Sequence, residues 1–273
     1  MEQNNDHIFF DLDGVLVSNK FFTTYYLDKV DEKLQQNNIK INRSDLLRRI
    51  FNLFNKMLIS DKKEERVRAF DWDELIRIIF KKYDLQWENT IEKFYESSKL
   101  KNYVRLYADV KKNLDWLKDK YKMALISNGL SKYQYQVLKI LKIEKYFSSI
   151  ILPDHINEIK PHVEIFDHAI SLCKLENKDN YEKHPYIGDS IYFDIFGANI
   201  GGFYSILISR KLSRKMKKLS IEERTKEFNK EENLKKYIRK DVLTSRFDLS
   251  NQDLNMLKPK KVICSLDELK LLF

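Results

Sequence analysis

Short apolar runs and helical patterns alternate along most of this chain. The apolar runs are residues 7–10, 123–126, 149–152, 184–187, 203–208 and 261–264. Between or after them, apolar positions recur with helical spacing at residues 114–120, 133–141, 162–175, 192–199 and 266–272. The last of these helices has a candidate capping box, Ser265 with Glu268. Short apolar strands that alternate with helices are typical of a parallel sheet covered on both faces, so the pattern predicts an α/β core with a doubly wound, Rossmann-like parallel sheet.

Residues 20–104 interrupt the alternation directly after the first predicted strand. Apolar spacing there predicts helices over about residues 21–37, 44–59, 72–83 and 88–99, without a convincing strand. Asp71 is the expected N-cap of the third helix, with Glu74 three residues later. We therefore expect two domains, which are a core of residues 1–19 and 105–273 and an all-helical lobe of residues 20–104 inserted into it.

The net charge of +9 is concentrated near the C-terminus. Residues 210–261 contain 17 Lys and Arg against 8 Asp and Glu, whereas the two signs are equal in the rest of the chain. The segment 210–260 is thus a basic insertion between the last two predicted strands. Ser220 and Glu223 form a candidate capping box for a helix that continues to about Lys240. Because its apolar positions are sparse, we expect this helix to bury little surface and to be mobile.

Two interpretations of the basic insertion remain open. One is an arm that recruits nucleic acid or an acidic partner, since the fifth predicted strand ends at the same edge of the sheet as the first. The other is a solvated elaboration that has no partner. We favour the second, because the insertion contains no recognised DNA-binding or RNA-binding motif.

Composition narrows the class of protein further. Apolar residues make up 43% of the chain, enough for a packed core, and no run of 18 apolar residues is present to span a membrane. The first residues lack the basic and apolar regions of a signal peptide. Cys173 and Cys264 are isolated, which argues against a disulfide framework and a zinc site. We expect a cytoplasmic enzyme without membrane contact.

Polar residues lie where ligands bind in open α/β sheets, beyond the carboxyl ends of the strands. The candidate site residues are Asp11 and Asp13 after the first strand, Ser127 and Asn128 after the second, Asp189 after the fourth, and Lys160 and Asp194 beside helices. Several carboxylates share a cleft with one lysine only when a cation offsets their charge, and oxygen ligands favour Mg²⁺. Asp11 and Asp13 share one side of an extended chain, so one can attack phosphorus while the other transfers protons.

These residues resemble the four motifs of the haloacid dehalogenase (HAD) superfamily. The matching segments are Asp11-Leu12-Asp13-Gly14-Val15-Leu16, Ser127-Asn128-Gly129, Lys160-Pro161, and Gly188-Asp189-Ser190 with Asp194. All four occur in the superfamily's order, and the helical lobe 20–104 has the position of its C1 cap. The superfamily often has Gly two or three residues before the motif lysine, where this chain has Asn157 and Glu158.

The resemblance implies phosphoryl transfer through an aspartyl-phosphate. Asp11 would be the nucleophile, and Asp13 would protonate the departing alcohol and then activate water. Ser127 and the backbone amide of Asn128 would bind phosphate oxygens. Lys160 would offset the charge on Asp11 and on the phosphoryl group.

The resemblance also implies a magnesium site. Mg²⁺ would be held by the Asp11 carboxylate, the backbone carbonyl of Asp13 and Asp189. Asp194 would orient Lys160 or a metal-bound water. The resulting expectation is a Mg²⁺-dependent phosphatase that hydrolyses a small phosphorylated metabolite.

Three other functions stay open as alternatives. The 2-haloacid dehalogenases of the superfamily attack carbon and need neither a metal nor the second acid, so the presence of Asp13 favours phosphate chemistry. A phosphomutase fits the same motifs, but hydrolysis is the commoner outcome when water enters the site. A binding module that keeps the fold and uses residues 210–260 has no need for the complete set of motifs.

Overall fold

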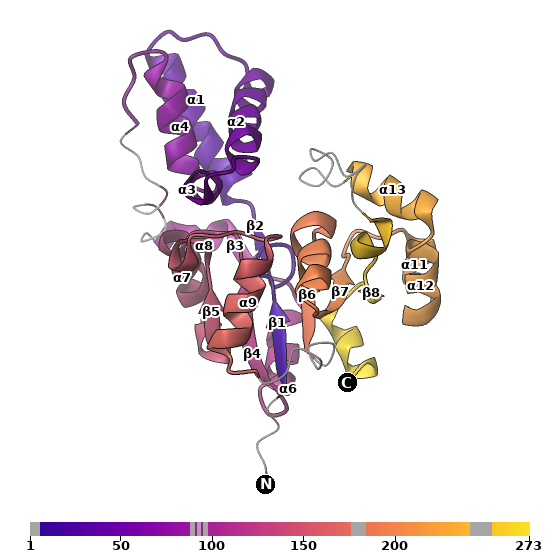
Figure 1. Ribbon diagram of the computed structural model, residues 1–273. Helices are drawn as coiled ribbons and strands as arrows, with labels where there is room; N and C mark the ends of the chain where they lie inside the picture. Colours follow the sequence, from indigo (N-terminus) through magenta and orange to yellow (C-terminus); the bar gives the residue numbers. More distant parts are fainter. Residues whose placement is uncertain (1–5, 88–90, 92–93, 95–97, 176–183, 241–252) are drawn as a thin grey trace.

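The computed structural model describes residues 6–87, 91, 94, 98–175, 184–240 and 253–273, and its centre is a six-stranded parallel sheet (Figure 1). The strands follow the order β5-β4-β1-β6-β7-β8, and each neighbouring pair is parallel. They are β1 His7–Phe10, β4 Lys122–Ile126, β5 Phe147–Ile151, β6 Pro185–Gly188, β7 Tyr204–Ile208 and β8 Lys261–Ile263. The six predicted strands and the α/β fold class are confirmed.

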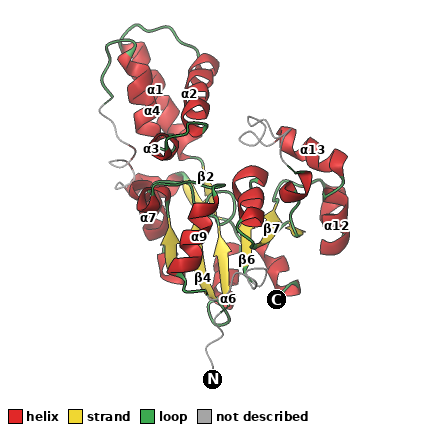
Figure 2. Cartoon of the chain, viewed as in Figure 1, coloured by secondary structure: helices red, strands yellow, loops and turns green. Residues whose placement is uncertain are grey.

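Each face of the sheet has its own apolar core, because successive side chains of a strand point to opposite faces. The helices beside the sheet are α6 Val110–Leu117, α7 Ser131–Leu141, α9 Val163–Leu172, the π-helix η5 Ile191–Phe196 and α10 Gly197–Ile200 (Figure 2). Ile8 and Phe10 belong to a buried cluster with side chains of α6 and α7, whereas Phe9 belongs to one with α9 and α10. Burial on both faces explains why the strands are continuously apolar.

A two-stranded antiparallel ribbon, which the sequence pattern does not predict, frames the insertion after β1. β2 Val17–Asn19 pairs with β3 Val104–Leu106, and strands of three residues are too short for a periodic signal. Between them lie η1 Phe22–Tyr26, α1 Leu27–Gln36, α2 Arg43–Leu58, α3 Lys63–Arg68, α4 Trp72–Lys81 and η2 Ser98–Asn102. Figure 1 shows α1–α4 gathered as a separate helical group above the sheet. The domain boundaries at residues 20 and 104 stay a prediction.

Three of the predicted helices in this insertion correspond to α1, α2 and α4. The π-helical η1 precedes α1, α3 is an additional helix, and the predicted helix at 88–99 lies mostly outside the described residues. Asp71 caps α4 as expected, since its side chain accepts a hydrogen bond from Glu74 N at 3.2 Å. Cys173 and Cys264 are unpaired, as expected. Within the described part of the chain, no helix has the length and apolarity needed to cross a membrane.

The basic insertion packs against the core, so the expectation that it buries little surface is wrong. The single expected helix is two helices, α12 Ile221–Phe228 and α13 Glu231–Lys240, preceded by α11 Arg214–Lys217. Phe228 and Leu234 are almost fully buried in a cluster that includes Leu207 of β7 and Val262 of β8. The predicted capping box at the start of α12 is confirmed. Residues 241–252 are not described. Binding of nucleic acid or an acidic partner by the insertion stays the alternative that we do not favour.

The C-terminal segment is the 3₁₀-helix η8 Leu266–Leu271 instead of the predicted α-helix, and the expected capping box does not form there. The Ser265 side chain accepts from Asp267 N at 3.2 Å. Glu268 instead accepts from Cys264 N at 2.6 Å and from the Arg224 guanidinium at 2.8 and 2.9 Å. Arg224 is only 2% exposed, so its buried charge holds Glu268 away from the capping position. The remaining short elements are η3 Glu144–Tyr146, α8 Pro153–Ile156 and η7 Leu254–Leu257.

Candidate active site

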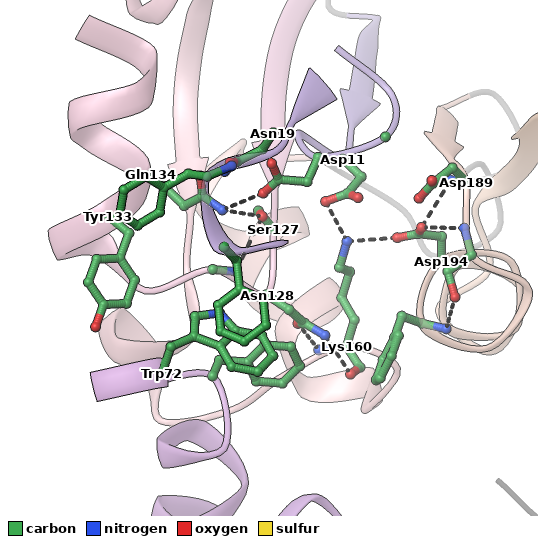
Figure 3. Close-up of a pocket in the computed structure, with 18 of the residues that line it drawn as sticks. Asp11, Asn19, Trp72, Ser127, Asn128, Tyr133, Gln134, Lys160, Asp189 and Asp194 are labelled. Carbon is green, nitrogen blue, oxygen red and sulfur yellow. Dashed lines mark hydrogen bonds and ion pairs between the residues drawn. The ribbon is translucent and has the colours of Figure 1, made fainter. Parts of the chain in front are cut away.

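The predicted site residues line one cavity of about 390 Å³ at the carboxyl edge of the sheet (Figure 3). Because β4 and β6 are the two neighbours of β1, the segments that follow these three strands converge at this edge. The predicted residues found in the lining are Asp11, Asp13, Ser127, Asn128, Lys160, Asp189 and Asp194. The fold therefore brings the whole predicted set together.

The ammonium group of Lys160 joins Asp11 to Asp194. Its Nζ lies 2.8 Å from Asp11 Oδ1 and 2.7 Å from Asp194 Oδ1, and it donates to the Ile126 carbonyl at 3.1 Å. The Tyr186 hydroxyl lies 3.0 Å from the same Nζ and donates to Asp194 Oδ1 at 2.8 Å. Lys160 is 2% exposed, so these protein groups replace water around its charge.

Burial dominates the protonation of the two aspartates that follow β1. It raises the pKa of Asp11 to about 7, although Lys160 acts in the opposite direction. Burial also raises the pKa of Asp13, against hydrogen bonds from the side chains of Gln134 and Asn19. For Lys160, burial tends to lower the pKa, but the neighbouring carboxylates raise it above its ordinary value. Lys160 therefore stays charged, and the crowded carboxylates around it favour a further cation.

The donor set of the cavity fits a hard divalent cation. Carboxylate oxygens of Asp11, Asp189 and Asp194 lie within 4.8 Å of one another. Asp194 is already engaged, because Lys160 contacts its Oδ1 and the backbone N–H groups of Asp189 and Ser190 donate to its Oδ2 at 3.0 and 2.9 Å. Both oxygens of Asp194 thus bind protein donors, which favours its predicted supporting role, whereas Mg²⁺ binding by Asp11 and Asp189 stays a prediction.

Gly14 allows the loop after β1 to approach Asp189. Its φ of +83° lies in the left-handed region that side chains with a Cβ rarely adopt. A Cβ at position 14 would lie 2.0 Å from Asp189 Oδ2. A glycine is therefore required both by the backbone conformation and by the close contact with a predicted metal ligand.

Ser127 and Asn128 occupy the turn after β4. The Asn128 side chain accepts from Lys160 N at 2.7 Å and donates to Lys160 O at 3.1 Å, which ties this turn to the loop before α9. The predicted phosphate contact of Asn128 uses its backbone amide, which these side-chain bonds do not occupy, and it stays a prediction. Ser127 Oγ accepts from Gly129 N at 3.3 Å. In the loop before α9, Asn157 adopts a left-handed φ of 55°, which Asn tolerates where the superfamily often has Gly.

Residues 8–208 match the family of haloacid dehalogenase-like hydrolases. The chain belongs to this family. The glyceraldehyde 3-phosphate phosphatase of Pyrococcus furiosus is 26% identical over 71% of this chain and 77% of its own length. The protein of the same name in Pyrococcus abyssi is 29% identical over the same shares. A phosphoglycolate phosphatase of Nitrosococcus oceani is 33% identical over 38% of this chain and 44% of its own length.

Solved structures show the same fold. The crystal structure of a HAD phosphatase from Thermococcus onnurineus has a TM-score of 0.67 at 22% identity, covering 98% of this chain and 97% of its own. The L-2-haloacid dehalogenase of Xanthobacter autotrophicus has a TM-score of 0.57 at 15% identity over the same shares. The chain is thus an enzyme of the hydrolase class with a HAD-like fold.

Gln134 and Tyr186 are among the polar residues that contact the site of this haloacid dehalogenase-like hydrolase without having been predicted. Gln134 of α7 donates from Nε2 to Asp13 Oδ2 at 2.9 Å and to Ser127 Oγ at 3.4 Å. The available signal is a buried amide on the apolar face of α7, next to Val137. Tyr186 offers a weaker signal, because a Tyr inside a buried strand also fits an ordinary core position.

An aromatic wall, formed by side chains of the insertion and of the core, covers the cavity of this hydrolase. Its members are Phe21, Phe22, Phe70, Trp72, Tyr133 and Phe193. The ring centroids of Phe22 and Trp72 lie 4.4 Å apart, and those of Phe70 and Phe193 lie 6.1 Å apart. The Tyr133 hydroxyl donates to Asp71 at 2.9 Å. The wall therefore presents mainly ring surface to a ligand.

Ion pairs, of which only Arg66–Glu158 is buried, join α3 to α9 and to the loop before it. Arg66 Nη2 lies 2.7 Å from Glu158 Oε2, and Lys63 Nζ lies 3.3 Å from both Glu158 and Glu164. Glu158, His162 and Glu164 also place potential metal-ligating atoms within 4.8 Å of one another. Because Arg66 and Lys63 already offset both carboxylates, we assign no metal to this group and interpret it as a contact between the insertion and the core.

Proposed function

We propose that this hydrolase is a Mg²⁺-dependent phosphatase that cleaves a small phosphate monoester through an aspartyl-phosphate intermediate. One observation carries the proposal, which is that Asp11 and Asp13 line one cavity with Lys160 Nζ at 2.8 Å from Asp11. A nucleophile, a second carboxyl for proton transfer and a cation for the phosphoryl charge are the groups that this reaction needs. A cytoplasmic location remains a prediction.

In the first step, a carboxylate oxygen of Asp11 forms a bond to phosphorus while the bond from phosphorus to the ester oxygen breaks. Asp13, in its protonated form, gives its proton to the departing oxygen, so that an alcohol leaves. Burial raises the pKa of Asp13, which favours this protonated form. Lys160 and the Ser127 hydroxyl stabilise the charge on the phosphoryl oxygens.

In the second step, water attacks the phosphorus of the aspartyl-phosphate and gives a proton to Asp13. The bond between phosphorus and Asp11 breaks, which releases inorganic phosphate and returns both aspartates to their starting states. Lys160 offsets the charge that returns to Asp11. Mg²⁺, when held by Asp11, Asp189 and the backbone carbonyl of Asp13, would neutralise the phosphoryl charge that such reactions develop.

The cavity favours a small substrate. Its volume of about 390 Å³ is at the low end for ligand pockets, and the aromatic wall limits the leaving group further. The relatives from Pyrococcus are named glyceraldehyde 3-phosphate phosphatases, and the relative from Nitrosococcus is named a phosphoglycolate phosphatase. These names support a phosphorylated three-carbon sugar or a compound of similar size as the first substrates to assay.

Hydrolysis of p-nitrophenyl phosphate tests the proposal. The wild type is assayed with Mg²⁺ and with EDTA, beside Asp11→Asn and the control Asp119→Asn, which changes an exposed aspartate outside the cavity. We expect turnover that requires Mg²⁺, survives in Asp119→Asn and is lost in Asp11→Asn. Turnover retained by Asp11→Asn would contradict the assigned nucleophile. A wild type inactive on this ester and on small sugar phosphates would contradict the phosphatase.

The same assay separates the remaining alternatives. A phosphomutase transfers the phosphoryl group to a second hydroxyl of its substrate, so it releases little inorganic phosphate. A 2-haloacid dehalogenase releases halide from 2-chloropropionate and does not need Asp13. We expect release of inorganic phosphate in step with the alcohol, no halide release, and loss of phosphate release in Asp13→Asn.

A further inference from the structure

Gln134 lies between Asp13, the proposed acid, and Ser127, the proposed phosphate ligand. Its Nε2 donates one hydrogen bond to Asp13 Oδ2 at 2.9 Å and another to Ser127 Oγ at 3.4 Å (Figure 3). Gln134 is 5% exposed. A primary amide carries two N–H donors, so both bonds can exist at the same time. One side chain therefore touches both the proposed acid and the proposed phosphate ligand.

The hydrogen bond from Gln134 makes the two carboxyl oxygens of Asp13 different from each other. Oδ2 accepts from Gln134, whereas Oδ1 is buried and has no hydrogen-bond partner among the residues that the structure describes. A carboxylic acid has one O–H donor, and an oxygen that already accepts from an amide is the poorer place for that proton. The proton of Asp13 is thus directed to Oδ1, the oxygen that accepts no hydrogen bond from the described residues.

The contact also sets the direction of the Ser127 hydroxyl. Ser127 Oγ accepts from Gly129 N at 3.3 Å and from Gln134 Nε2 at 3.4 Å. A hydroxyl has two acceptor lone pairs and one hydrogen, so two incoming donors occupy both lone pairs. The hydrogen of Ser127 is then left to donate toward the cavity, where the proposed reaction places phosphate oxygens.

The local backbone is built around this amide. A Cβ at position 129 would lie 1.9 Å from Gln134 Nε2, so the glycine in the turn after β4 provides the space that Gln134 occupies. Tyr133 and Val137 are buried on the same side of α7 and hold the helix against the core. The amide is therefore held in place before any substrate arrives.

We propose, on the basis of the phosphatase proposed above, that Gln134 is a positioning residue that directs the proton of Asp13 to Oδ1 and the hydroxyl of Ser127 to the phosphoryl group. The effect of Gln134 on Asp13 depends on the leaving group, because an alkoxide needs the proton of Asp13 in order to depart and a good leaving group does not. Its effect on Ser127 is the same for every substrate, because the phosphoryl group does not change.

Two variants, Gln134→Met and Gln134→Glu, remove the N–H donors while they keep the length of the side chain. Gln136→Met is the matched control, since Gln136 lies on the same helix and outside the cavity lining. The substrates are 2,4-dinitrophenyl phosphate, phenyl phosphate and glycerol 3-phosphate, which place an increasing demand on the acid. Values of kcat/KM are compared because they report the step in which the alcohol leaves, and thermal unfolding checks that each variant folds.

We expect both Gln134 variants to lose about 10²-fold in kcat/KM on glycerol 3-phosphate and only a few-fold on 2,4-dinitrophenyl phosphate. We also expect inhibition by inorganic phosphate to weaken by about 3- to 10-fold, as loss of one oriented hydrogen bond implies. Gln136→Met should match the wild type in both measurements.

Other results separate failure of this inference from failure of the phosphatase. An equal loss on all three esters, or no loss on glycerol 3-phosphate, would overturn the effect on the proton of Asp13. Unchanged inhibition by inorganic phosphate would overturn the effect on the Ser127 hydroxyl, and either result leaves the phosphatase intact. A wild type that cleaves none of the three esters with Mg²⁺ would overturn the phosphatase, and the role of Gln134 with it.

Discussion

Arg66 and Glu158 form a buried ion pair between the helical insertion and the sheet domain. Their side chains are 9% and 1% exposed, and Arg66 Nη2 lies 2.7 Å from Glu158 Oε2. Arg66 also donates to the backbone carbonyls of Ser60 and Asp61 at 2.9 and 3.2 Å. Since Glu158 stands two residues before Lys160, a contact made by α3 is joined directly to the loop that carries the cation of the site.

Replacing Arg66 should leave the charge of Glu158 buried, with an ion pair to Lys63 and a hydrogen bond from Ile159 N still in place. We expect Arg66→Met to lower the free energy of unfolding by about 3 kcal/mol, because breaking a buried pair from one side is strongly destabilising. Urea denaturation measures this change. Arg68→Met, on an exposed position of the same helix, should stay within about 0.5 kcal/mol of the wild type. Equal stabilities of the two variants would show that the pair contributes nothing.

Placing a side chain at position 14 should weaken magnesium binding. In Gly14→Ala, the Cβ would meet Asp189 Oδ2 at 2.0 Å, so Asp189 must move away from the proposed metal site. Gly202→Ala is the control, because Gly202 has a similar φ of +80° and the same backbone strain. We expect the Mg²⁺ concentration for half-maximal activity to rise about tenfold or more in Gly14→Ala alone. A similar rise in both variants would attribute the effect to strain.

Removing the hydroxyl of Tyr186 should disturb Lys160 without opening a cavity. Tyr186→Phe keeps the buried ring but loses the donor to Asp194 Oδ1 and the oxygen 3.0 Å from Lys160 Nζ. Because this hydrogen bond is to a charged group, its loss should lower kcat/KM on p-nitrophenyl phosphate about tenfold. Tyr204→Phe, in β7 and outside the cavity, should be unaffected. Equal activities of the two variants would contradict a role for the Tyr186 hydroxyl.

Asp109 should make stability depend on pH in acid. Burial tends to raise its pKa, but hydrogen bonds from Arg210, Ser265 and Leu266 N outweigh burial and hold the pKa below its ordinary value. Its contribution is therefore complete above the unfolded-state pKa, about 4, and is lost as the pH falls through the folded-state pKa. We expect the stability difference between wild type and Asp109→Asn to be constant above about pH 5 and to shrink toward pH 2.

Urea unfolding between pH 2 and pH 7 measures this difference. Asp119→Asn, an exposed change in the turn after α6, should parallel the wild type across the range. A difference for Asp109→Asn that stays constant down to pH 2 would contradict the role of its ionised carboxylate.

Elements with continuous or periodic apolar patterns could be predicted from the sequence, and elements without such a pattern could not. The inner strands β1, β4, β6 and β7 of the main sheet are buried along most of their length, so their apolar runs are unambiguous. The ribbon β2–β3 has three residues per strand, and its pairing is fixed by tertiary position. The sequence pattern did not indicate that α12 and α13 pack against the core, because these helices contain few apolar residues. Their packing also relies on Arg224, whose guanidinium donates hydrogen bonds to Glu268 and to backbone carbonyls.

The site could be predicted where its residues form motifs at strand ends, since topology brings such ends together. Residues that act through another side chain give no such signal. Gln134 was missed because an amide in a helix is ordinarily a surface residue, and its partners Asp13 and Ser127 are brought to it only by the tertiary fold. The pairing of Arg66 with Glu158 joins positions 92 residues apart, and no local pattern connects them.

The chain enters the helical insertion through β2 and leaves it through β3, and these two strands pair with each other. Val17 faces Leu106 and Asn19 faces Val104, and Asp13 forms a further bridge with Val17. Two separate flexible tethers would let the insertion drift in any direction, whereas a hydrogen-bonded pair bends mainly about one axis. The ribbon begins at Val17, four residues after the proposed acid, and Val17 also bridges to Asp13. The entry to the insertion and the loop that carries Asp13 are therefore one continuous hydrogen-bonded structure.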